Sequence, residues 1–111
     1  MLYIDTDVVR GIMFIHLNGT LDNYTYKELE MELNYLLYKQ GMHYFVFDFN
    51  DLDIFDFNLL SWFNNKLVEI FLSCGKVALW GLNKNYLSNI GSQDELFFIN
   101  NGREAFNYLL G

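Results

Sequence analysis

The sequence has a single cysteine, Cys74, so no disulfide bridge can form within the chain. It does not open with the charged segment, apolar run and small-residue cleavage site of a secretory signal peptide. The longest uncharged stretches, such as 70–75 and 77–83, fall far short of the roughly 20 apolar residues that a transmembrane helix needs. These absences favour a cytoplasmic protein without direct membrane insertion.

Basic residues are also scarce. Lysine and arginine number 7 against 14 aspartates and glutamates, which gives a net charge of −7. Residues 1–56 carry the whole of this charge, and three carboxylates lie within 51–56. Such a chain repels phosphate backbones and anionic lipid headgroups, so we expect neither a nucleic-acid partner nor attachment to a membrane through a polybasic segment.

Apolar residues are plentiful by contrast. They make up 52% of the 111 residues, enough to offset the entropy of ordering the chain. No linker-like segment, low-complexity tract or internal repeat divides the sequence. A length of this order suits one hydrophobic core, so residues 1–111 are expected to form a single domain.

Hydrophobic periodicity predicts an alternation of strands and helices. Strands are expected at 2–4 and 11–17, joined as a hairpin through the polar residues Asp5–Arg10, and then at 43–49, 77–82 and 96–99. A capping box of Thr25 and Glu28 starts a helix that ends at Gly41. Further helices are expected after the loop 50–56, at 85–90 and at 102–110.

This alternation predicts an α/β sandwich. Its mixed sheet of four or five strands is largely parallel after the first hairpin, with about four helices mostly on one side. The strand at 43–49 is almost continuously apolar, as in a strand covered on both faces, and should be central. The residues predicted to be buried are Phe45, Phe47, Val77, Leu79, Leu33, Phe63 and Leu67.

Asp22 and Asp56 each follow a predicted strand and precede a predicted helix. Both therefore belong at the carboxyl ends of strands, where open α/β sheets place their ligand sites. Helix capping explains them better than acid–base chemistry, because no histidine or nucleophile accompanies them. Asp51, Asp53 and Asp56 lack the glycine and the terminal glutamate of a calcium loop, so we expect no metal there.

The remaining candidates for chemistry favour structural roles. His16 and His43 are not at metal-ligand spacing with Cys74, and a glycine-rich phosphate loop is missing. We therefore expect no enzyme activity, no cofactor and no metal. On the second long helix, Trp62 falls on a polar face with Asn58 and Glu69, which suggests an exposed interface anchor or a tryptophan half-buried at the helix edge.

Several segments together resemble the STAS domains, whose bacterial members include anti-sigma factor antagonists. The first block of the family, L-x-G-x-L-D, matches Leu17–Asp22, and the apolar strand that ends in aspartate matches Val46–Phe49. Phe55–Leu60 takes the place of the block D-S-[ST]-G-L, while 75–79 and 103–106 resemble the later strand and the closing helix. The resemblance covers nearly the whole chain and implies a STAS-like sandwich.

The sequence departs from the family at the residue after Asp56. In the family, a serine or threonine at this position is phosphorylated by the partner anti-sigma kinase, whereas Phe57 has no hydroxyl. Asn58 and Leu59 replace the next hydroxyl and the glycine. Asp22 and Asp56 are retained, which argues for the loop geometry.

The resemblance implies a bacterial, non-catalytic protein in transcription regulation. It would bind an anti-sigma factor or kinase-like partner through Asp22, Asp56, Phe57, Asn58, Ser61 and Trp62. The alternative is an accessory or scaffold subunit of a transporter ATPase or sensory complex. An enzyme that uses the two aspartates is the third hypothesis, and homodimerisation is left open. A ring at Phe57 would either pack down or, with Trp62, bracket an apolar patch for the partner.

Overall fold

A five-stranded sheet with the order β1-β2-β3-β4-β5 organises the computed structural model, which describes residues 1–111. β1 and β2 form an antiparallel hairpin, and the later neighbours are parallel. The elements are β1 (Leu2–Val9), β2 (Ile12–Leu21), α1 (Tyr26–Asn34), the π-helical turn η1 (Tyr35–Lys39), β3 (Tyr44–Phe55), the 3₁₀ turn η2 (Phe57–Leu59), α2 (Leu60–Leu72), β4 (Lys76–Trp80), the 3₁₀ turn η3 (Lys84–Asn89), β5 (Leu96–Ile99) and α3 (Glu104–Leu110). The predicted α/β sandwich with a mixed sheet is confirmed.

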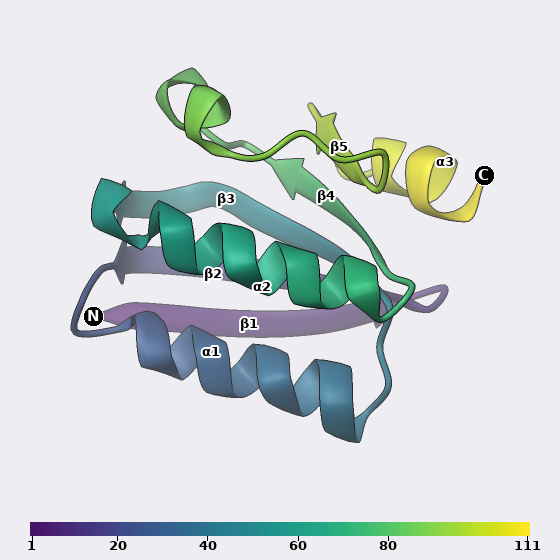
Figure 1. Ribbon diagram of the computed structural model, residues 1–111, viewed down its shortest axis with the longest axis horizontal. Coiled ribbons are helices and arrows are strands. Elements are labelled where there is room, and N and C mark those ends of the chain that lie inside the picture. Colours follow the sequence, from purple (N-terminus) through teal and green to yellow (C-terminus); the bar gives the residue numbers. More distant parts are fainter.

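α1 and α2 lie side by side over one face of the sheet (Figure 1). Successive residues of a strand point to opposite faces, so Phe45 and Phe47 of the central strand β3 meet these helices. Phe63 of α2 is fully buried, and its ring stands edge-on to Phe47 at 5.3 Å. All seven residues predicted to be buried are buried.

The short helix α3 packs on the opposite face of the sheet. Its Ala105 and Leu109 pack with Ile12, Val46 and Ala78, which alternate with the core residues of the first face. Seven helical residues span about 10 Å, whereas five strands are about 19 Å wide. α3 therefore covers only part of this face.

The first strand is longer than predicted. Asp5–Arg10 was expected to be a polar connection, but β1 continues to Val9 and pairs with β2 throughout. Arg10 and Gly11 form the turn with φ values of 53° and 80°, as two-residue hairpin turns require. The prediction was wrong because hydrogen bonds to the backbone of β2 hold residues 5–9 in the strand, and these bonds do not depend on the side chains of β1.

The central strand is longer as well. Residues 50–55, predicted as a loop, belong to β3 and pair with the end of β2 through two register shifts. The pairing of β3 with β4 ends at Asp48, so the rest of β3 has a partner strand on one side only. Polar residues are tolerated there because they face solvent.

Candidate functional site

Asp22 and Asp56 lie at the same end of the sheet. They follow Leu21 of β2 and Phe55 of β3, which are paired in register. The backbone N–H of Asp56 donates to the carbonyl oxygen of Leu21 at 2.9 Å. The two strand ends that carry the aspartates are thus joined directly.

Asp22 holds the turn that leads into α1. Its Oδ1 accepts from the backbone N–H groups of Tyr24 at 2.9 Å and Thr25 at 3.2 Å. The hydroxyl of Thr25 donates to the carbonyl of Thr20 at 2.8 Å and accepts from the N–H of Asp22. The predicted capping box with Glu28 does not form, because this hydroxyl is bound to the end of β2 instead.

Gly19 shapes the end of β2 that leads to Asp22. Its φ is +97°, a conformation that side chains disfavour, and a Cβ atom would collide with the carbonyl oxygen of Met1. The N–H of Thr20 donates to the same carbonyl at 3.0 Å. The glycine of the first block is therefore required by a close approach of backbone.

Asp56 caps the turn η2. Its Oδ1 accepts from the N–H of Asn58 at 2.9 Å, and its φ and ψ of −65° and 123° are those of an N-cap residue. Neither Asp22 nor Asp56 forms an ion pair within the chain. Both carboxylates cap backbone donors, and the one side-chain group among their hydrogen-bond partners is the hydroxyl of Thr25, 3.3 Å from Oδ1 of Asp22.

Phe57 stands at the surface in a stack of three rings. It is 51% exposed, and its ring lies 4.5 Å from that of Tyr86 with an interplanar angle of 13°. Tyr86 in turn stacks on the buried Phe55 at 5.1 Å, and its hydroxyl donates to the carbonyl of Phe55. The stack holds Phe57 in one orientation and leaves part of its ring open to solvent.

Trp62 is turned the other way, toward α1. It is half-buried, packs edge-on against Tyr26 at 5.3 Å and donates from Nε1 to Glu30 at 2.8 Å. Asn58 and Ser61 are exposed. Phe57 and Trp62 thus have different neighbours on the two flanks of the α2 N-terminus, and Trp62 lies at a helix edge.

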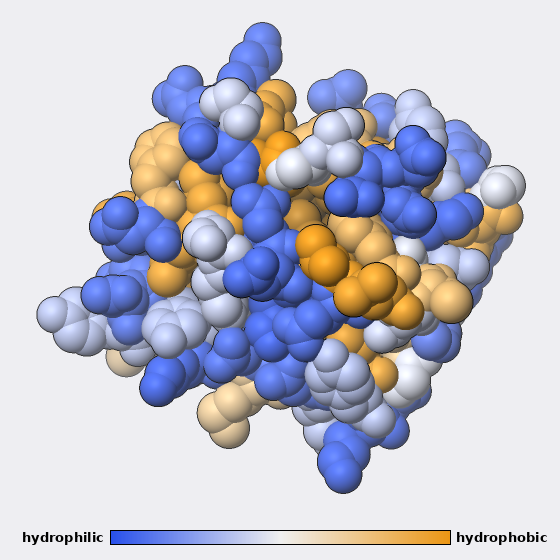
Figure 2. Space-filling view, in the orientation of Figure 1, coloured by the Kyte–Doolittle hydropathy of each residue, from blue (hydrophilic) through white to orange (hydrophobic).

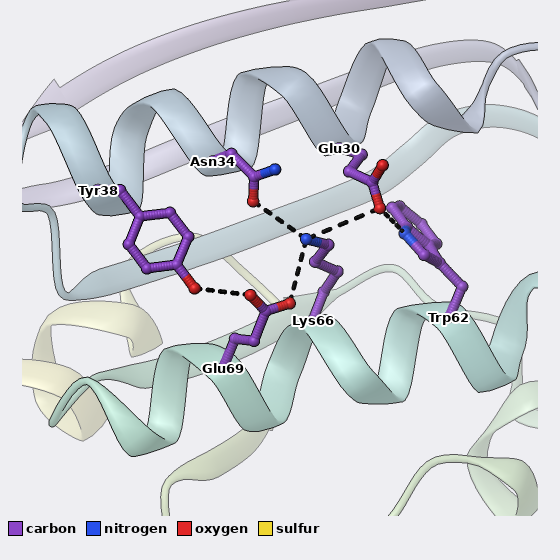
Figure 3. A network of polar contacts seen from close by, with 6 residues as sticks. All are labelled: Glu30, Asn34, Tyr38, Trp62, Lys66 and Glu69. Atoms are coloured by element: carbon purple, nitrogen blue, oxygen red, sulfur yellow. Dashed lines mark hydrogen bonds and ion pairs between the residues drawn. The ribbon is translucent and has the colours of Figure 1, made fainter.

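A polar network joins α1 and α2 beyond Trp62 (Figure 3). The Nζ atom of Lys66 lies 3.0 Å from Asn34 and within ion-pair distance of Glu30 and Glu69. Tyr38 donates to Glu69 at 2.6 Å. The surface above these helices mixes hydrophobic and hydrophilic areas (Figure 2).

This network changes two pKa values. The hydrogen bond from Tyr38 and the proximity of Lys66 lower the pKa of Glu69, against an opposing effect of burial. The hydrogen bond to Glu69, burial and the negative charge of Glu69 raise the pKa of Tyr38. Both directions indicate that a neutral phenol and a carboxylate are the favoured pair between the helices.

The sequence did not reveal one polar pair, His16 and Asp48. These residues face each other across β2 and β3, and Nδ1 of His16 lies 2.6 Å from Oδ2 of Asp48. The side chain of Asp48 is 10% exposed. A carboxylate inside an otherwise apolar strand is the signal that could have found this pair.

The chain has no group of three or more histidines, cysteines or carboxylates arranged to hold a metal ion. None of its helices combines the length and the apolar character needed to cross a membrane. Arg10, Arg103 and the two aspartates of the strand ends have no ion-pair partner.

Comparison with known proteins shows which fold and family this chain has. No curated protein matches by sequence. The Thermotoga maritima protein TM1081 superposes with a TM-score of 0.79 and 17% identity, over 97% of this chain and 95% of that one. The unphosphorylated anti-sigma factor antagonist SpoIIAA gives 0.74 and 14% over 92% of both chains, and an anti-sigma factor antagonist from Mycobacterium paratuberculosis gives 0.71 and 13% over 100% and 96%. These structures share the fold. The model of the STAS domain family matches residues 3–99, so the chain belongs to the STAS domain family.

Proposed function

We propose that this STAS domain is a non-catalytic protein-binding module that acts as an anti-sigma factor antagonist. Its partner is a protein of the anti-sigma factor kinase class. The docking surface consists of Asp22, Asp56, Phe57, Asn58, Ser61 and Trp62. The observation that carries the proposal is the exposed ring of Phe57 beside two oriented carboxylates.

Phe57 has the properties of an interface anchor. A ring that is already fixed by stacking loses little conformational freedom when a partner covers it. Its exposed part offers apolar area at the centre of the docking surface, where binding energy concentrates. Asp22 and Asp56 add negative charge at its side, so we expect a partner surface with an apolar pocket rimmed by lysine or arginine.

The docking surface lacks the usual phosphorylatable residue. Solved structures of SpoIIAA include an unphosphorylated and a phosphorylated form, whereas Phe57 has no oxygen that could accept phosphate. A phosphate beside Asp56 would bring about −1.5 to −2 charges next to a carboxylate and repel the partner. With phenylalanine at this position, the module is either always competent for docking or regulated at another residue.

Two nearby hydroxyls could take over regulation. Ser61 is exposed, whereas Thr25 is buried and its hydroxyl is engaged by Thr20 and Asp22. If a kinase modifies the chain here, we expect the phosphate on Ser61.

The second candidate is an accessory subunit of a transporter ATPase or a sensory complex. A docking surface without a phosphate switch at position 57 also suits a subunit that stays bound in its complex. Phe57 would then be covered in the resting complex rather than in a regulated one.

Calorimetric titration with an anti-sigma factor kinase from the same genome tests the first function. Phe57→Ala should weaken binding by about tenfold or more, because a central aromatic anchor is lost. Phe98→Ala is the matched control, since Phe98 is 47% exposed and lies on the edge strand β5. Equal effects of both variants, or no binding of the kinase together with specific binding of a transporter ATPase, would reject the antagonist function.

Intact-mass measurement after incubation with the kinase and ATP tests the missing switch. The unmodified sequence should gain no phosphate at position 57, and Phe57→Ser should gain one. A phosphate on Ser61 or Thr25 of the native chain would show that regulation has moved to another residue.

A further inference from the structure

The largest hollow of the molecule lies away from the docking surface, on the sheet face that α3 covers only in part. Its volume is about 640 Å³, against 230–470 Å³ for the other four. Cavities of about 300–1,000 Å³ are the usual size of small-molecule sites. We call this hollow the α3-face cavity.

Three aromatic side chains form its apolar walls: Phe14 of β2, Trp80 of β4 and Phe106 of α3. Phe14 lies 6.0 Å from Phe106 between ring centroids. Gly102, before α3, lies against the same walls, since a Cβ atom there would be 3.4 Å from the indole of Trp80. Walls of this kind suit a flat, apolar ligand body.

His16 gives the cavity an oriented polar group. Its Nδ1 is bound to Asp48, whose other oxygen accepts from the backbone and the side-chain amide of Asn50 at 3.0 and 2.7 Å. Both oxygens of the carboxylate therefore have partners, and the imidazole is held by one of its two nitrogens. The side chain of His16 is 35% exposed, so Nε2 is the nitrogen left for a ligand.

One of the two arginines of the chain lines the cavity, and the other lies against one of its aromatic residues. Arg103 lines it, and the guanidinium of Arg10 lies 5.4 Å from the ring centroid of Phe106. Neither has a carboxylate partner, although acidic residues outnumber basic ones by 14 to 7. The unpaired guanidinium of Arg103 beside apolar walls favours an anion, and Asp7 on the β1 side disfavours a multiply charged one.

We propose that the α3-face cavity binds a small aromatic carboxylate. Arg103 takes the carboxylate through its planar fork of donors, the aromatic ring lies among Phe14, Trp80 and Phe106, and His16 offers Nε2 to a polar atom of the ligand. This site is separate from the docking surface and does not depend on the proposed function.

The two tryptophans allow a direct test by NMR. Trp80 lines the cavity, whereas Trp62 packs against α1 on the opposite face of the sheet. The ¹⁵N-labelled full chain is titrated with phenylacetate. The indole N–H signal of Trp80 should shift saturably, and that of Trp62 should stay in place. No saturable shift at millimolar concentration, or an equal shift of both indoles, would overturn the proposal.

Charge recognition is tested with a ligand and variants of matched size. Phenethylamine has the same ring and the opposite charge, and it should not saturate the Trp80 signal. Arg103→Gln should weaken phenylacetate binding roughly 10- to 100-fold, because a hydrogen bond to a charged group is lost. His16→Gln should weaken it several-fold.

Lys27→Gln provides the control for net charge. It removes one positive charge from an exposed position on α1, on the other side of the sheet, and should leave binding unchanged. Arg103 is exposed and unpaired, so Arg103→Gln should keep the thermal midpoint of the native chain. If Lys27→Gln weakens binding as much as Arg103→Gln does, or if phenethylamine binds equally well, the cavity does not recognise a carboxylate.

Discussion

The two faces of the sheet differ in how completely helices cover them. On one face, α1, η1 and α2 enclose a core of 22 buried residues, among them Phe45, Phe47 and Phe63 with no exposed surface. On the other face, α3 encloses a cluster of only seven buried residues. The same strands contribute to both, because their side chains alternate.

This difference assigns different roles to the two faces: one stabilises the fold, and the other can carry polar groups. A face that is fully covered must be apolar, because each buried polar group needs a partner. The incompletely covered face keeps His16, Asp48 and the unpaired Arg103 near its open cavity. We infer that the α1–α2 face contributes most of the folding free energy, while the open face and the strand ends are free to bind.

The largest expected effect lies on the covered face. Phe63→Ala should lower the free energy of unfolding by roughly 3–5 kcal/mol, since it leaves a cavity among Phe47, Phe49 and Phe55. Phe106→Ala on the open face should cost only roughly 1–2 kcal/mol, because Phe106 is half-buried. Urea denaturation measures both. Equal losses would contradict the division between the faces.

A smaller effect is expected for the buried carboxylate of the open face. Asp48→Ala should cost roughly 1–3 kcal/mol, because the hydrogen-bonding groups of His16 and Asn50 lose their acceptor. Asp51 lies in the same strand and is exposed, so Asp51→Ala should change the free energy of unfolding by less than about 0.5 kcal/mol. If the two variants unfold at the same urea concentration, the hydrogen bonds of Asp48 do not stabilise the fold.

At the proposed docking surface, Phe57→Ala should lower the free energy of unfolding by about 0.5–1.5 kcal/mol, the usual contribution of a stacked aromatic pair. Thermal unfolding followed by circular dichroism would show a midpoint close to that of the native chain. A loss as large as that of Phe63→Ala would place the ring in the core and remove the argument for an interface anchor.

The smallest effect concerns pH and the bridge between α1 and α2. The folded-state pKa of Glu69 is lowered, so its contribution is present above the ordinary value of 4.5 and is lost as the pH falls through the folded value. The folded-state pKa of Tyr38 is raised, so its contribution is present below the ordinary value of 10.0 and is lost as the pH rises through the folded value.

Tyr38→Phe tests this directly. It should lower stability by less than about 1 kcal/mol at neutral pH, because the pair is partly solvent-exposed. The difference from the native chain should shrink below pH 4.5 and above pH 10.0. A difference that stays constant over this whole range would mean that the hydrogen bond does not depend on the charge of Glu69.

The local pattern of apolar residues was sufficient to predict the fold class. Leu29 and Leu33 recur at helical spacing, and 44–49 is apolar on both faces apart from Asp48, so each element shows on its own which sides it must bury. The order of elements, the central position of β3 and the buried residues followed from this periodicity. The positions of Asp22 and Asp56 at neighbouring strand ends followed as well, since parallel strands end at one edge of the sheet.

The tertiary structure alone decided the extent of β1 and β3, the neighbours of Trp62 and the pairing of His16 with Asp48. Residues 5–9 and 50–55 look like loops because aspartates at 5, 7, 51 and 53 interrupt them. Yet β2 pairs with both segments, across the hairpin turn for 5–9 and from a distant part of the chain for 50–55. Trp62 lies against Tyr26 and Glu30, and His16 meets Asp48 across 32 residues of chain. Hydrophobic periodicity says which side of an element is buried, but which side chains meet depends on strand register and helix packing, which are set by contacts between distant segments.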